Sequence, residues 1–242
     1  MDDLTARIVA WKREDLRDEW VDWRSLTRAA RARSDQKPRF SFLSAIRSAG
    51  HAVRIIPEIR GSSADGGATV GPADVAALAS RYRAGGAAAL SVVTEPRFLG
   101  GSLDRLYHAG RSSELPVMMR DFVIEPVQIY RGIATGADAV FLHAGILDAA
   151  RLRDFVTVIE GLGRDAVVGI CDEQDLPSAI ESGARIVMVM SSPDLGAVEQ
   201  LAGRLPPGRV TILERGLLAG DPVENVRGFD AVLVSDWTTP EQ

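Results

Sequence analysis

Cysteine is nearly absent from this sequence, which has 242 residues and a single cysteine, Cys171. One cysteine cannot form an internal disulfide, and it cannot supply the several thiolates of a zinc or iron–sulfur cluster. A disulfide framework and a cysteine-based metal centre are therefore excluded as the basis of the fold.

Excess positive charge is also missing, because 28 Lys and Arg stand against 33 Asp and Glu, for a formal net charge of -5. This balance disfavours binding to nucleic acid or to an anionic membrane. No apolar run approaches the roughly 20 residues needed to cross a bilayer. The N-terminal stretch MDDLTARIVAWKREDL lacks the apolar core and cleavage site of a signal peptide. The sequence therefore predicts a cytoplasmic protein whose partners are small molecules or proteins, with no nucleic acid and no membrane.

What the sequence does contain is a series of short runs rich in Val, Ile and Leu, separated by helical segments that often end in Gly. This pattern is typical of βα units that build a parallel sheet. Eight strands are expected, at residues 53–60, 88–94, 116–122, 139–143, 166–171, 186–190, 210–214 and 231–235.

Eight consecutive units favour an α/β fold of the (β/α)8 TIM barrel type over residues 53–242. An open doubly wound sheet is the alternative. The barrel is favoured because the loop GSSADGG after the first strand lacks the GxGxxG order of a dinucleotide-binding fold. No linker divides the chain, so residues 1–242 are interpreted as one domain.

Residues 1–50 are expected to form an N-terminal helical extension. Its segments IVAWKREDL and FSFLSAIRSAG are predicted to be helices that cover the bottom or side of the barrel, and the charged residues 15–39 are predicted to be exposed or mobile. Only WTTPEQ ends the chain, which predicts a truncated or missing eighth helix. The flank of the first and eighth strands would then be covered by the N-terminal segment or by a partner subunit, as in a homodimer.

Barrel active sites lie at the carboxyl ends of the strands, so the inward side chains there are the candidates. The alternation of a strand places Glu58 and Arg60 on one face. The same counting along the other strands gives Ser91, Val93, Met118, Arg120, Phe122, Phe141, His143, Gly169, Cys171, Met190, Glu214, and Ser235 or Asp236.

Each candidate also has a structural interpretation. Glu58 and Arg60 could form a simple rim ion pair, His143 could be a hydrogen-bonded core histidine, Asp121 could cap a turn, and Cys171 could be a small buried apolar residue. Taken together, charged residues that end apolar strands in three or more units are harder to explain by packing, since burying them unpaired costs several kcal/mol each.

Five stretches together resemble the indole-3-glycerol phosphate synthase family. They are IVAWKREDL, IIPEIRGSSADGG, LSVVTEPRFLGGSLDRL, LPVMMRDFVIEPVQIY and ILERGL. The resemblance extends over nearly the whole chain. It implies a TIM barrel and a carboxy-lyase of tryptophan biosynthesis. In that reaction 1-(2-carboxyphenylamino)-1-deoxyribulose 5-phosphate closes its ring and loses carbon dioxide and then water. The resemblance implies no metal and no organic cofactor, and a small anionic substrate.

The family's functional residues carry over only in part. Glu58 and Glu214 match two glutamates, Phe122 an aromatic that contacts the substrate, Ser63 a loop serine and Gly216 a phosphate-loop glycine. Arg60 and Arg120 stand where the family has lysines, and Gly169 where it has the glutamate on the fifth strand; Met190 replaces an asparagine and Arg215 a serine. The predicted catalytic residues are Glu58, Arg60, Arg120, His143 and Glu214. The predicted substrate-binding residues are Ser63, Ser91, Phe122, Phe141, Arg215, Gly216 and Ser235.

The departures affect proton transfer. An arginine keeps its proton, so Arg120 can stabilise an oxyanion but is a poor general acid, and Gly169 has no side chain with which to act. His143 is the nearby residue able to substitute. Three functions remain open: the family reaction, a divergent activity on another anionic substrate in specialised biosynthesis, and a non-catalytic binding protein.

Overall fold

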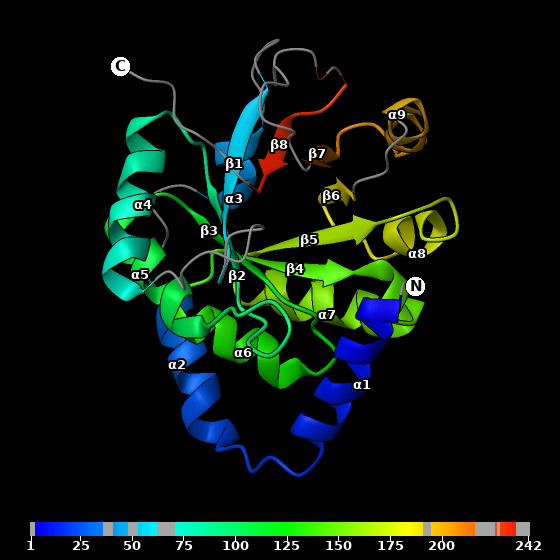
Figure 1. The fold of residues 1–242 in the computed structure, drawn as a ribbon. Coiled ribbons are helices and arrows are strands. Elements are labelled where there is room, and N and C mark those ends of the chain that lie inside the picture. Colours follow the sequence, from blue (N-terminus) through cyan, green and yellow to red (C-terminus); the bar gives the residue numbers. More distant parts are fainter. Residues whose placement is uncertain are drawn as a thin grey trace.

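The structure is a computed structural model, and it describes residues 3–35, 41–47, 53–61, 71–190, 195–215, 226 and 228–235 (Figure 1). The strands are β1 (Arg54–Ile59), β2 (Leu90–Val93), β3 (Val117–Arg120), β4 (Ala139–His143), β5 (Asp165–Ile170), β6 (Ile186–Val189), β7 (Val210–Arg215) and β8 (Ala231–Val234). The helices are α1 (Asp3–Arg17), α2 (Trp23–Asp35), α3 (Phe42–Ile46), α4 (Pro72–Ala84), α5 (Leu103–Ser113), α6 (Pro126–Thr135), α7 (Ala149–Gly161), α8 (Leu176–Glu181) and α9 (Leu195–Gly203), with a 3-10 turn η1 (Ala144–Ile146).

The eight strands form a closed parallel barrel in which each strand pairs with the next along the chain. Closure is made by β1 and β8, whose register runs from Arg54 opposite Ala231 to Pro57 opposite Val234. The expected strands and the (β/α)8 barrel are therefore confirmed, and the open doubly wound alternative is excluded.

The barrel interior is filled by every second residue of each strand, as period-two geometry requires. Its buried side chains are Ile56, Ala89, Met118, Ala139, Phe141, Val167, Ile186, Met188, Val210, Ile212, Ala231 and Leu233. Phe42 and Ile46 of α3 belong to the same cluster and are fully buried. The Leu43 N–H also donates to Asp165 Oδ2 at 3.0 Å, at the start of β5. The helix α3 therefore closes the amino-terminal end of the barrel, as expected for the segment that contains it.

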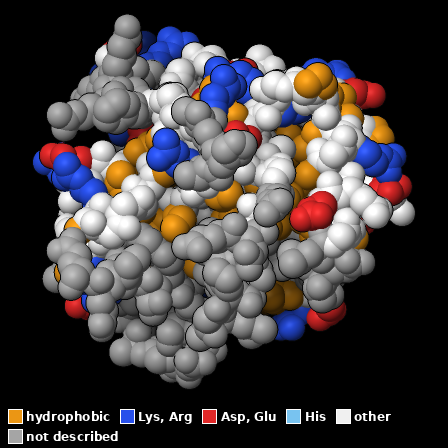
Figure 2. Space-filling model, turned by 90° about the horizontal axis from the view of Figure 1, so that it is seen from above, with side chains coloured by type: hydrophobic (Ala, Val, Ile, Leu, Met, Phe, Trp, Pro, Cys, Tyr) orange, Lys and Arg blue, Asp and Glu red, His pale blue; other side chains and the backbone are white. Residues whose placement is uncertain are grey.

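The outward side chains of the strands pack against the surrounding helices. Val92, Met119 and Leu142 are examples, each at most 1% exposed. Seen from above, charged side chains lie mostly around the periphery and hydrophobic ones nearer the centre (Figure 2). Within the described residues, no helix is long and apolar enough to span a membrane.

The position of α1 differs from the expectation. Instead of covering the bottom or side, α1 lies over the carboxyl end of the barrel, where Thr5 lines the central cavity. Lys12 Nζ lies 2.7 Å from Asp121 Oδ1, just after β3, and both side chains are nearly buried. The ring of Trp11 meets Phe98 edge-on at 6.1 Å. These contacts with residues distant in the sequence determine where the helix packs. They cannot be predicted from the amphipathic pattern of the helix alone.

The expectation that residues 15–39 are exposed is confirmed for most of residues 15–35, the part that the structure describes, although residues 23–35 form the helix α2, which packs beside α6 (Figure 1). Ala30 is fully buried, and the ring of Trp23 meets that of Tyr130 edge-on at 5.9 Å. Arg33 reaches Asp138 at 3.1 Å. A charged sequence can pack in this way because its arginines lie on the outer face or end in ion pairs.

The predicted absence of an eighth helix concerns residues 236–242, which lie outside the described part of the chain. The prediction that the N-terminal segment or a partner subunit covers the flank of β1 and β8 stays a prediction, as does the single domain.

Candidate active site

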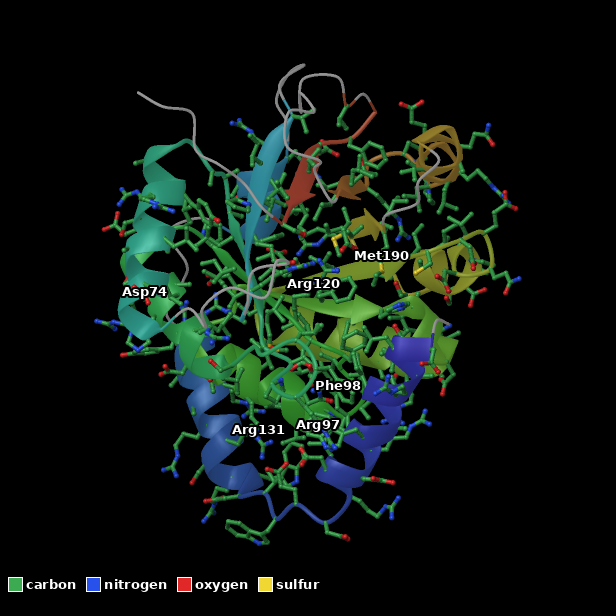
Figure 3. All side chains as sticks on the ribbon, viewed as in Figure 1. Asp74, Arg97, Phe98, Arg120, Arg131 and Met190 are labelled. Atoms are coloured by element: carbon green, nitrogen blue, oxygen red, sulfur yellow. The ribbon has the colours of Figure 1, made fainter. Side chains whose placement is uncertain are left out.

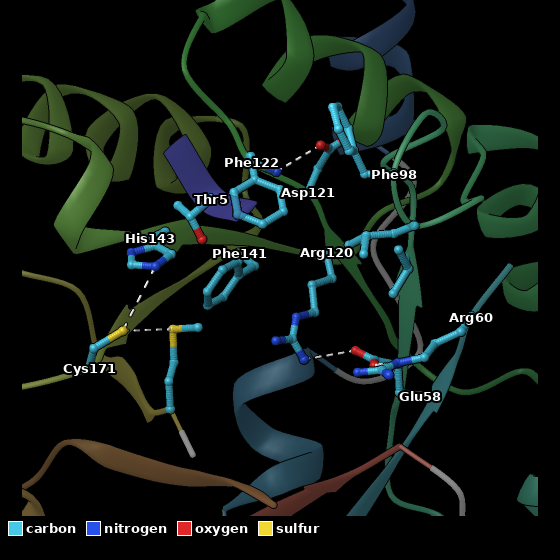
Figure 4. A pocket seen from close by; sticks show the side chains of 13 residues that line it. Thr5, Glu58, Arg60, Phe98, Arg120, Asp121, Phe122, Phe141, His143 and Cys171 are labelled. Carbon is cyan, nitrogen blue, oxygen red and sulfur yellow. Dashed lines mark hydrogen bonds and ion pairs between the residues drawn. The ribbon is translucent and has the colours of Figure 1, made fainter. Parts of the chain in front are cut away.

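The carboxyl ends of the strands surround a cavity of about 300 Å³ (Figure 4). Most of the side chains that line it come from strand ends, and the others come from α1 and the loop after β2. They are Thr5, Glu58, Arg60, Val93, Phe98, Leu99, Arg120, Asp121, Phe122, Phe141, His143, Cys171 and Met190. The inward alternation counted along the sequence therefore brings most of the candidates together.

Glu58 has a fully buried side chain that is bound by three other side chains. Arg120 donates to its Oε1 at 2.8 Å, Ser91 Oγ donates to the same oxygen at 3.3 Å, and Arg60 Nε donates to Oε2 at 2.5 Å. Burial alone raises the pKa of Glu58, but the charges of Arg120 and Arg60 outweigh it and hold that pKa below its usual value. Glu58 is therefore ionised and engaged on both oxygens.

Arg120 lies between two carboxylates, because its second terminal nitrogen donates to Glu214 Oε1. Its guanidinium carbon lies 5.5 Å from the centre of the Phe141 ring, in cation–π geometry. Burial lowers the pKa of Arg120, but Glu58 and then Glu214 raise it above the ordinary arginine value. The side chain is therefore a fixed cation and not a proton donor.

Glu214 stands behind Arg120 at the end of β7 and does not line the cavity. Its second oxygen, Oε2, is buried and has no hydrogen-bond donor among the residues that the structure describes. Glu214 therefore holds the guanidinium of Arg120 in position. The two negative charges of Glu58 and Glu214 are balanced by the two positive charges of Arg60 and Arg120.

Gly169, on β5, has no space for a side chain. A Cβ built on it would lie 2.4 Å from Phe141 Cε2, 2.5 Å from Phe141 Cζ and 3.1 Å from Met190 Sδ. Real Cβ atoms do not approach other heavy atoms as closely as the two ring contacts. The Phe141 ring therefore occupies the position from which a side chain on β5 would enter the cavity.

His143 ends β4 beside Gly169 and is 6% exposed. Its Nδ1 accepts a hydrogen bond from the Gly145 N–H at 3.1 Å, so in the neutral ring the proton is carried by Nε2. Nε2 lies 3.8 Å from Cys171 Sγ. In this tautomer Nε2 can donate a hydrogen bond but has no lone pair with which to accept a proton. The geometry therefore favours His143 as a hydrogen-bond donor over His143 as a general acid or base.

Cys171 lines the same cavity beyond β5. Burial of the thiol, followed by the nearby charges of Asp175 and Asp172, raises the pKa of Cys171 to about 11. A thiol with this pKa is protonated at neutral pH and is a poor nucleophile. Cys171 is therefore not an activated nucleophile, but the residue is exposed, so its interpretation as a small buried apolar residue was wrong.

The remaining candidates are placed as follows. Phe122 lines the cavity, and Ser91 lies in the barrel interior, where it bonds Glu58 without lining the cavity. Ser235 follows β8 and is half-buried away from the cavity lining. Ser63, Gly216 and Asp236 lie outside the described residues, as does the side chain of Arg215.

Sequence reasoning did not place Thr5, Phe98 and Leu99 in the site. Thr5 belongs to a helix expected elsewhere, while Phe98 and Leu99 belong to the loop after β2, which the strand-by-strand counting does not reach. Asp121 accepts the Phe122 N–H at 2.7 Å, which agrees with the interpretation of this residue as a turn cap. It also lines the cavity and pairs with Lys12. Among the described residues, no group of three His, Cys, Asp or Glu side chains is placed to hold a metal ion.

Comparisons with known proteins agree with this fold. A solved structure titled for the N-acetylmannosamine-6-phosphate 2-epimerase from Clostridium perfringens matches with a TM-score of 0.62 and 14% identity, over 83% of this chain and 91% of that one. At this identity the likeness concerns the fold alone.

Sequence relatives are much closer. Indole-3-glycerol phosphate synthase from Pelodictyon phaeoclathratiforme is 34% identical, in an alignment that covers 98% of this chain and 96% of the relative. Indole-3-glycerol phosphate synthase 1 from Streptomyces coelicolor is 34% identical over 86% of this chain and 78% of its own. The sequence profile of the family matches residues 5–237. The chain belongs to the indole-3-glycerol phosphate synthase family.

Proposed function

We propose that this protein is a carboxy-lyase of the indole-3-glycerol phosphate synthase type, acting on 1-(2-carboxyphenylamino)-1-deoxyribulose 5-phosphate. The observation that carries the proposal is the ion-paired group of Glu58, Arg120 and Glu214 at the carboxyl end of the barrel, in a chain that matches this family over nearly its full length. Two of these three residues match glutamates that the family resemblance assigns to the reaction, and the cavity is lined by aromatic rings suited to an anilino group.

In this proposal Arg120 acts as a fixed charge. When the ring closes, the new carbon–carbon bond pushes electrons onto the ketone oxygen, and a cation nearby lowers the energy of the oxyanion. Glu58 and Glu214 hold the guanidinium in place, so little reorganisation is needed as the charge develops. Because Arg120 keeps its own proton, the proton that finally neutralises the oxygen comes from another source.

His143 is assigned as the second stabilising group. Its Nε2–H can donate to the ketone oxygen while the Gly145 N–H holds the ring in that tautomer. A neutral histidine that polarises a carbonyl through a hydrogen bond is a known catalytic arrangement in barrel enzymes. The proton then reaches the oxyanion from water, and His143 does not change its charge.

A specific observation favours a second candidate function, which is a divergent activity on another anionic substrate. Phe141 fills the position from which the family's β5 glutamate would act, so this cavity has a bulky ring where the family has a base. Arg60, whose side chain is 41% exposed, provides a planar cation suited to a carboxylate or phosphate. The two candidate functions both place an anionic substrate in this cavity. They differ in the chemical step that takes place beside β5.

One experiment separates these functions. The purified protein is incubated with the carboxyphenylamino-deoxyribulose phosphate, and formation of the indole product is followed by its fluorescence. Turnover supports the lyase. Saturable binding of the same compound by calorimetry without turnover supports the divergent activity. If neither turnover nor binding is observed, the result supports a non-catalytic protein and contradicts both proposals. The variant Arg120→Gln should abolish turnover, and His108→Gln on the outer helix α5 is the control that should not change it.

A further inference from the structure

The loop after β2 is built around one buried carboxylate, that of Glu95, which is 0% exposed. Its Oε1 accepts the Arg97 N–H at 2.9 Å, and its Oε2 accepts the Phe98 N–H at 2.8 Å and the Leu99 N–H at 2.7 Å. The Gly101 N–H donates to the Glu95 backbone carbonyl at 2.7 Å. The side chain of Glu95 thus replaces the missing backbone partners of three successive residues.

This loop supplies one wall of the cavity. Phe98 and Leu99 line it directly. The guanidinium of Arg97 lies over the ring of Phe98 at 5.7 Å (Figure 3). It also lies over the ring of Trp11 at 5.3 Å, which connects the loop to α1. The two hydrogen bonds to Glu95 Oε2 come from the same two residues whose side chains face the cavity. Glu95 therefore holds the backbone of the two residues whose side chains form the cavity wall.

The loop is also packed closely against neighbouring backbone. A Cβ on Gly101 would lie 2.4 Å from the Val93 carbonyl oxygen, and one on Gly61 would lie 1.9 Å from the Gly100 carbonyl oxygen. Gly100 has a φ of 61°, in the left-handed region. With both ends of the loop held in this way, its middle depends on the Glu95 carboxylate for its position.

We propose that Glu95 is a positioning residue for the cavity: through the backbone of Phe98 and Leu99, it sets the wall that selects the ligand. The proposal does not depend on which reaction the cavity performs. The anionic form matters because a carboxylate has acceptor capacity for all three N–H groups. An amide has a single acceptor oxygen, and its NH₂ group would point at a donor.

The variant Glu95→Gln tests this with two readouts that need no activity. The first is hydrogen exchange at the amides of residues 97–99. The second is the reaction of Cys171, which lines the same cavity and is the chain's single cysteine, with two thiol reagents. One reagent is the bulky dithionitrobenzoate and the other is the small iodoacetamide. The ratio of their two reaction rates reports the size of the cavity opening, because a change in the reactivity of the thiol affects both rates and drops out of the ratio. Glu125→Gln is the matched control, because Glu125 precedes α6 as its N-cap residue and does not line the cavity.

In Glu95→Gln we expect faster exchange confined to the loop and a several-fold higher reagent ratio, and in Glu125→Gln neither change. With the carboxyphenylamino substrate, KM should rise about tenfold with kcat changed less than about twofold, since ground-state fit and not chemistry is altered. Faster exchange with an unchanged reagent ratio would overturn the proposal, because the loop would then be ordered by Glu95 without shaping the cavity. Unchanged exchange would overturn it as well. Absence of turnover in the wild type would contradict the proposed function and leave these two readouts decisive.

Discussion

The ring of Phe141 lies where a side chain on Gly169 would have to be, with 2.4 Å between Phe141 Cε2 and the position of a Cβ on Gly169. The two residues are on neighbouring strands, β4 and β5, and both face the inside of the barrel. A ring on one strand and a glycine on the next are therefore a matched pair. The Phe141 ring fills the space at the centre of the site that a side chain on β5 would otherwise occupy.

The first prediction concerns this pair. Gly169→Ala should destabilise the protein by about 1–3 kcal/mol, because the new methyl group overpacks against the ring. In a Phe141→Leu background the same change should cost much less, since leucine lacks the two ring atoms that collide. Urea unfolding of the four proteins in this double-mutant cycle measures the coupling. Additive effects would show that the two positions are independent.

The second prediction concerns Arg120. Arg120→Gln leaves Glu58 buried with the partly exposed Arg60 and leaves Glu214 without its cation, so we expect a loss of about 3–5 kcal/mol in the free energy of unfolding. The control is Arg131→Gln, because Arg131 pairs with Glu19 at the surface, and it should cost less than about 1 kcal/mol. Equal losses in the two variants would show that the buried pairs do not hold this site together.

The third prediction is a pH dependence. The pKa of Glu58 is lowered in the folded protein from an ordinary value of 4.5, so its ion pairs stabilise the fold above about pH 4.5 and this contribution is lost as the pH falls below that value. The stability difference between the wild type and Glu58→Gln should therefore shrink from pH 6 to pH 3. Denaturant unfolding at several pH values measures it. A difference that stays constant over this range would contradict the lowered pKa.

The fourth prediction concerns the thiol. With its pKa raised to about 11 from an ordinary 9.0, Cys171 should have about 100-fold less thiolate at pH 7.5 than an unperturbed thiol. Alkylation by iodoacetamide should be correspondingly slow, and it should accelerate about tenfold per pH unit up to pH 9. Cys171→Ser should keep most of the activity. Rapid alkylation at neutral pH, or loss of activity in the serine variant, would mean that the thiol is activated.

The fold could be predicted from the sequence because it depends on local patterns. The period-two alternation that fills the barrel also places Glu58, Arg120 and His143 on the inner face, so counting along the strands brings them together. The motif ILERGL likewise locates Glu214 at the end of β7.

The rest could not be predicted in the same way, since it depends on contacts between distant residues. The position of α1 is determined by Lys12 and Asp121, which are far apart in the sequence. The role of Phe141 is visible only when its ring is seen against Gly169. Glu95 is followed by a proline in a short polar stretch and resembles an ordinary loop residue until its three backbone partners are seen.

The most direct test of the proposed function compares the wild type with His143→Ala in the fluorescence assay for the indole product. We expect turnover by the wild type and a fall of about 100-fold in kcat for His143→Ala, the usual effect of removing one hydrogen-bond donor to an oxyanion. His143→Gln, which keeps an N–H donor, should lose less. An inactive wild type would contradict the assigned reaction, and a fully active His143→Ala would contradict the role given to this histidine.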